Sequence, residues 1–85
     1  MAQKNAYHVR DEYGTLVAGS LQSSYDLTCR LAWALRQIGS CDFMVVDTGL
    51  NRAISEVVEY NEDLDNFAIA QARKLWKDHK RKLYV

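Results

Sequence analysis

The sequence predicts a small α+β domain in which two helices pack on one antiparallel sheet, with the elements in the order ββαββα. Two pairs of short segments contain alternating or β-branched apolar residues, and each pair precedes a longer segment with apolar residues at helical spacing. The composition agrees, because 48% of the 85 residues are apolar and 26% are charged, which is typical of a folded globular chain. This length suits one domain, residues 1–85.

The first two strands are predicted at residues 7–10 and 15–18. Residues 7–10, YHVR, alternate between apolar and polar positions, as a half-buried strand does. The intervening DEYG begins with an aspartate that can accept hydrogen bonds from the turn backbone, and it ends with a glycine that tolerates positive φ. These features predict a β-hairpin with Tyr13 at its tip.

The first helix is predicted over SSYDLTCRLAWALRQIG, residues 23–39. Ser23 is a candidate N-cap, and Asp26 lies where a capping box places its acceptor. Gly39 is placed for the C′ position, where a left-handed backbone favours glycine. The apolar residues that form one stripe at helical spacing are Leu27, Leu31, Ala34, Leu35 and Ile38.

The second pair of strands is predicted on either side of a turn at residues 48–52. Residues 42–47, DFMVVD, contain four consecutive apolar residues, as a central strand covered on both faces does. Residues 53–60, AISEVVEY, fit a strand by their alternation and a helix by the spacing of Ile54 and Val57. The β-branched residues and the preceding turn favour the strand, and therefore a second hairpin.

The second helix is predicted over residues 61–83. Asn61 is its candidate cap, acidic residues lie in its first turns and basic residues lie at its end, which complements the helix dipole. His79 is expected on the apolar side as a buried histidine with a hydrogen-bond partner. The residues assigned to the apolar face are Leu64, Phe67, Ala68, Ala72, Leu75, Trp76 and Leu83.

Charge is segregated along the C-terminal part of a chain that has no net charge. Residues 51–69 hold five acidic residues and one basic residue, whereas residues 70–85 hold six basic residues and one acidic residue. This basic face is either solvated helix surface or a contact for phosphates or for an acidic protein surface. The basic residues that share one face of the second helix are Arg73, Lys74, Lys77, Lys80 and Arg81.

Two other groups are candidate binding residues. The acidic block, made of Glu56, Glu59, Glu62, Asp63 and Asp65, is the first group. It either meets a basic surface on another protein or only complements the helix dipole and forms the polar face of a strand. The aromatic group lies on the first helix and contains residue types that anchor protein interfaces. Packing at the edge of the core and a contact between two copies of the chain are its alternative interpretations. The candidates are Glu59, Glu62 and Asp63 in the acidic block and Tyr25, Trp33 and Arg36 in the aromatic group.

No arrangement of residues predicts a metal, a cofactor or a catalytic centre. Two cysteines and two histidines lack the close ligand pairs of a structural zinc site, and no phosphate-binding glycine loop is present. No nucleophile has a base and an orienting group at a suggestive spacing. We therefore expect a non-enzymatic protein without a cofactor. The N-terminus has no apolar signal and no run approaches the ~18 apolar residues of a membrane span, so we expect a cytoplasmic protein with free thiols and no membrane partner.

The layout of residues 7–48 resembles that of small phage-encoded inhibitors. In those proteins a hairpin such as YHVRDEYGTLVAG is followed by a helix such as SYDLTCRLAWALRQIG and a strand such as DFMVVD. Inhibitors of bacterial RNA polymerase and some anti-CRISPR proteins are similar in this order of elements. The resemblance implies a small protein that blocks or modulates a host protein complex. The alternative is a small nucleic-acid-binding regulator that uses the basic helix, although a neutral chain without a known nucleic-acid-binding motif favours a protein partner.

Overall fold

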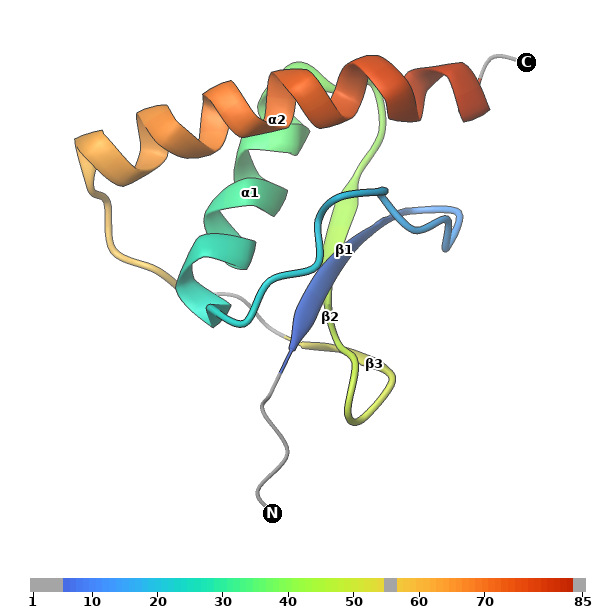
Figure 1. Ribbon diagram of the computed structural model, residues 1–85, viewed down its shortest axis with the longest axis horizontal. Coiled ribbons are helices and arrows are strands. Elements are labelled where there is room, and N and C mark those ends of the chain that lie inside the picture. The colour runs from blue at the N-terminus through green and yellow to red at the C-terminus, as the bar shows by residue number, and fades with distance from the viewer. Residues whose placement is uncertain (1–5, 55–56, 84–85) are drawn as a thin grey trace.

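The computed structural model describes residues 6–54 and 57–83 and consists of a three-stranded antiparallel sheet with two helices (Figure 1). The α+β class is therefore confirmed, whereas the order ββαββα is wrong by one strand. The elements in chain order are β1 (Tyr7–Asp11), α1 (Tyr25–Ile38), β2 (Phe43–Asp47), β3 (Arg52–Ile54) and α2 (Glu62–Leu83).

The strand expected at residues 15–18 is absent because a side chain takes over part of the pairing with β1. This segment runs beside β1 and makes only an isolated bridge between Leu16 and Arg10. It then turns at Gly19, whose φ is +86°. The hydroxyl of Ser20, which is fully buried, accepts a hydrogen bond from the Val9 amide at 2.9 Å in place of a backbone carbonyl. The alternation of apolar residues gave no sign of this substitution.

β2 is the central strand, as its apolar run predicted. It pairs antiparallel with β1 and with β3, so that Val45 lies opposite both Val9 and Ile54. The second hairpin is therefore confirmed, with Asn51 in the turn at a φ of 50°. Its second strand is shorter than predicted: β3 ends at Ile54, residues 55 and 56 lie outside the described residues, and residues 57–60 form neither a strand nor a helix.

α1 covers one face of the sheet and buries Leu31 and Leu35 in the core with Val9 and Val45. Its N-cap is Ser24 rather than Ser23, since the Ser24 hydroxyl accepts the Leu27 amide at 3.2 Å.

The end of α1 also differs from the prediction. Gly39 ends the helix with a φ of −87°, so the predicted left-handed C′ conformation is wrong. A glycine is needed for another reason: a Cβ atom there would lie 2.8 Å from the carbonyl oxygen of Leu35 and 2.9 Å from the Phe43 ring.

α2 crosses α1 near the C-terminal end of α1 (Figure 1). Asn61 caps it as predicted, because its side-chain oxygen accepts the Leu64 amide at 3.0 Å. Ala68 and Ala72 are buried where α2 packs against the core. Phe67 was expected on this buried face, but 58% of it is exposed, so it lies outside that face.

The C-terminal half of α2 is held over the end of the sheet. Trp76 packs edge to face on Phe43, the first residue of β2, with the ring centroids 5.9 Å apart. Leu75 lies so close to Gly19 that a Cβ atom on the glycine would be 2.9 Å from it. These contacts fix one side of α2 to the domain, and its other side faces solvent. The helix has 22 residues and is therefore about 33 Å long.

Candidate functional site

The solvent side of α2 carries the basic face that the sequence predicted. Its cations extend from the middle of the helix to its last turns, and none has a carboxylate partner within the described part of the chain. The only acidic residue among them is Asp78, which is also exposed. The structure therefore presents five like charges on a fixed helix without neutralising them. The basic face consists of the exposed residues Arg73, Lys74, Lys77, Lys80 and Arg81.

The opposite side of the same helical segment is anchored by a buried pair, His79 and Asp11. The Nε2 atom of His79 donates to the Asp11 carboxylate across 2.8 Å, and both side chains are almost completely buried. The other carboxylate oxygen of Asp11 accepts the amides of Tyr13 and Thr15, each at 2.9 Å. The predicted aspartate turn is thus confirmed. The pair fixes the orientation of the basic face relative to the sheet.

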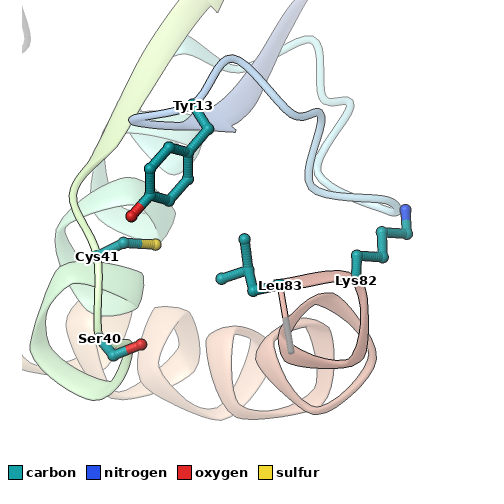
Figure 2. A pocket seen from close by; sticks show the side chains of 5 residues that line it. All are labelled: Tyr13, Ser40, Cys41, Lys82 and Leu83. Atoms are coloured by element: carbon teal, nitrogen blue, oxygen red, sulfur yellow. The ribbon is translucent and has the colours of Figure 1, made fainter. Parts of the chain in front are cut away.

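An open pocket of about 410 Å³ lies beside this anchor, between the turn after β1, the end of α1 and the last turn of α2. Figure 2 shows the Tyr13 hydroxyl, the Cys41 thiol and the Leu83 side chain turned toward the same space, with Lys82 at its rim. Ser40 completes the lining. The pocket therefore offers a thiol, two hydroxyls and one ammonium group to a ligand.

The thiol in this pocket is poorly suited to nucleophilic chemistry. Burial raises the pKa of Cys41, and the negative charges of Asp11, Glu12 and Asp42 raise it further. The nucleophilic form is the thiolate, so these surroundings disfavour it at neutral pH. Within the described ranges, no three His, Cys, Asp or Glu side chains are arranged to hold a metal ion. Cys41 and the buried Cys29 are not joined in a disulfide.

The aromatic group predicted on α1 does not form one exposed surface. Tyr25 packs edge to face on Tyr7 with a centroid distance of 5.4 Å, and Arg36 donates from Nη1 to the Phe43 carbonyl at 2.9 Å. Trp33 is half-buried and lines a small cavity between α1 and the segment before α2. Each of the three side chains therefore takes part in packing, and only Trp33 lies beside residues of the acidic block.

The acidic block is also divided. Asp65 is buried and forms an ion pair with the buried Arg30 at 2.8 Å, while Arg30 also contacts Asp26 at 3.1 Å. Burial opposes ionisation of Asp65, but hydrogen bonds from Arg30 and from the Asn61 backbone, together with the charge of Arg30, lower its pKa overall. This carboxylate is structural. Glu56 lies outside the described residues, and Glu59, Glu62 and Asp63 are exposed.

A second, smaller cavity lies where the segment before α2 passes α1. It has a volume of about 170 Å³, and no single stretch of sequence indicates it, because its walls come from three separate segments. It brings together Trp33 of the aromatic group and Glu59 of the acidic block, with Tyr60 as an additional aromatic residue. The residues that line it are Arg30, Trp33, Val58, Glu59, Tyr60 and Asp65.

No protein-family model, no curated protein and no solved structure matches the chain. Neither of the helices in the described residues is both long and apolar enough to span a membrane. Function has to be inferred from the chemistry of the surfaces themselves.

Proposed function

We propose that this protein is a small non-enzymatic binding protein that uses the basic face of α2 to dock on an acidic surface of a protein partner and thereby blocks or modulates it. The observation that carries this proposal is the set of five exposed cations that have no carboxylate partner among the described residues. Inhibition of a host complex by a phage or mobile-element product, which the resemblance implies, is one form that such docking would take.

The cost of placing these charges together supports a binding role. Lys77 and Arg81 are one helical turn apart, a spacing at which like charges destabilise a helix by a few tenths of a kcal/mol. If this side of the helix contacted only water, basic and acidic residues in alternation would suit it equally well. Complementary charge on a partner would remove this repulsion and would also speed association and select the partner.

A protein partner fits the whole outer side of α2 better than a polyanion does. Phe67 precedes Lys74 by seven residues, so both lie on the same side of the helix, and the exposed phenyl ring is an interface anchor beside the cations. The exposed carboxylate of Asp63 lies one turn before Phe67 on that side. The outer side of α2 is thus a surface of limited extent that combines one apolar side chain with basic and acidic groups. Such a surface matches a discrete patch on a protein.

The basic face also supports a second candidate, a nucleic-acid-binding regulator in which the same residues contact phosphates. If all five cations neutralised phosphates, the affinity would fall by roughly 500-fold between about 50 and about 200 mM salt. Contacts with a protein patch that includes Phe67 would weaken far less, because the apolar part is not screened.

The test is fluorescence anisotropy with a labelled polyglutamate peptide and a labelled DNA duplex at these two salt concentrations. The variant K77Q/R81Q removes two cations from the basic face. Arg52→Glu makes the same change in net charge at an exposed position on β3 and is the matched control.

Binding of the peptide that K77Q/R81Q weakens and Arg52→Glu preserves would support the protein-partner proposal. Tight duplex binding with a steep salt dependence, reduced by about two in its slope in K77Q/R81Q, would support the second candidate instead. If neither probe binds at low salt, or if both variants behave alike, the basic face is only helix surface.

A further inference from the structure

The cavity between α1 and the start of α2 carries a surplus of negative charge. The guanidinium of Arg30 is in contact with two carboxylates, those of Asp26 and Asp65. Of these two only Asp65 lines the cavity, and Glu59 adds a second carboxylate to the lining and a third to the group. Three negative charges against one positive charge leave two uncompensated. The exposed Glu62 and Asp63 follow in the first turn of the adjoining helix and deepen the negative potential.

The walls of this cavity are of a kind that stabilises organic cations. Trp33 and Tyr60 both line it, and aromatic rings attract an ammonium or guanidinium group placed over their faces within about 6 Å. Trp33 is held by packing against the core, whereas Tyr60 is 80% exposed at the opening. Val58 supplies an apolar surface for the carbon stem of a long side chain.

We propose that this cavity binds a basic side chain, such as that of a lysine, from a protein partner. The carboxylate of Glu59 and the rings of Trp33 and Tyr60 would receive the ammonium group, and Val58 would contact its aliphatic stem. An anionic guest is disfavoured, because the single cation of the site already faces two carboxylates. The two ends of α2 then recognise opposite charges: basic side chains at its start and an acidic surface at its end.

This cavity shares no residue with the basic face, so the experiments can support one proposal and overturn the other. The titration that tests it uses N-acetyl-lysine N-methylamide, with N-acetyl-norleucine N-methylamide as a neutral probe of nearly the same shape. The readout is the indole N–H resonance of Trp33 in a proton–nitrogen correlation spectrum. The indole of Trp76, which packs on Phe43 over the end of the sheet, is the internal reference.

The variants are Glu59→Gln and Tyr60→Ser, both at exposed positions where the fold tolerates a change. Asp78→Asn removes an exposed carboxylate from the other end of α2 and is the matched control, and K77Q/R81Q separates this site from the basic face. We expect a saturable shift of Trp33 with the lysine probe and none with norleucine. Each cavity variant should weaken the affinity roughly threefold to fivefold, while the two other variants leave it unchanged.

A shift of Trp33 that norleucine produces equally would overturn the proposal, since the cavity would then be an apolar contact without charge selection. So would a lysine titration that moves Trp76 as much as Trp33, or an affinity that Glu59→Gln and Tyr60→Ser leave at the wild-type value.

Discussion

Replacing Asp11 with alanine should destabilise the fold far more than its position at the end of β1, next to an exposed turn, suggests. The substitution removes three hydrogen bonds, two from the turn amides of Tyr13 and Thr15 and one from His79. Water can replace the first two, because both turn residues are exposed. His79 is only 1% exposed, so no water would replace the carboxylate and its Nε2 donor would be left unpaired. An unpaired buried donor costs about 1–3 kcal/mol, and with the lost turn hydrogen bonds the total loss of stability is about 3 kcal/mol.

Urea unfolding followed by circular dichroism measures this loss, and Asp47→Ala is its matched control. Asp47 also accepts two turn amides, those of Gly49 and Leu50, but among the described residues it has no buried side-chain partner. Its replacement should cost less than about 1 kcal/mol. The double variant D11A/H79L should recover part of the loss, because an apolar side chain leaves no donor unpaired. If Asp11→Ala costs no more than Asp47→Ala, the buried pair does not hold α2 as described.

Three further results are expected. Phe67→Ser should change the free energy of unfolding by less than about 0.5 kcal/mol, whereas Phe43→Ala should cost about 3–5 kcal/mol, and comparable losses in urea unfolding would contradict the observed burial. Cys41 should react with iodoacetamide more slowly than a free cysteine at neutral pH and faster as the pH rises, as mass spectrometry will show; a rate above that of free cysteine would refute the assigned surroundings. Asp65→Asn should lower the free energy of unfolding most at neutral pH, and its difference from wild type should shrink as the pH falls below about 4. The reason is that the ion pair, which lowers the pKa of Asp65, stabilises the fold only while the carboxyl is ionised. A difference in the free energy of unfolding that does not vary with pH would exclude this contribution.

The parts of the fold that local chemistry determines could be predicted from the sequence. Helical spacing located both helices, Asn61 was recognisable as a cap, and the apolar run at residues 43–46 identified the central strand. The aspartate turn after β1 was predictable for the same reason, since its hydrogen bonds join residues only two and four positions apart. The five cations of the basic face could be assigned to one side of a helix from their spacing alone.

The remaining features depend on contacts between distant residues. His79 and Asp11 are 68 positions apart, and no pattern in either segment indicates that they meet. Ser20 replaces a strand partner through its side chain, which periodicity cannot detect. The cavity beside Trp33 needs α1 and the segment before α2 to lie together. Phe67 was misplaced because an exposed aromatic residue breaks the rule that apolar residues on a helix share the buried side.

The central claim is that the outer side of α2 is a binding surface, and the most direct measurement is a map of amide chemical shifts on adding the polyglutamate peptide to the labelled protein. The account predicts that the largest changes occur between Arg73 and Arg81, with smaller changes around Phe67, and that they saturate. Changes centred on β3 or on the pocket beside Cys41, or no changes at saturating peptide, would contradict it.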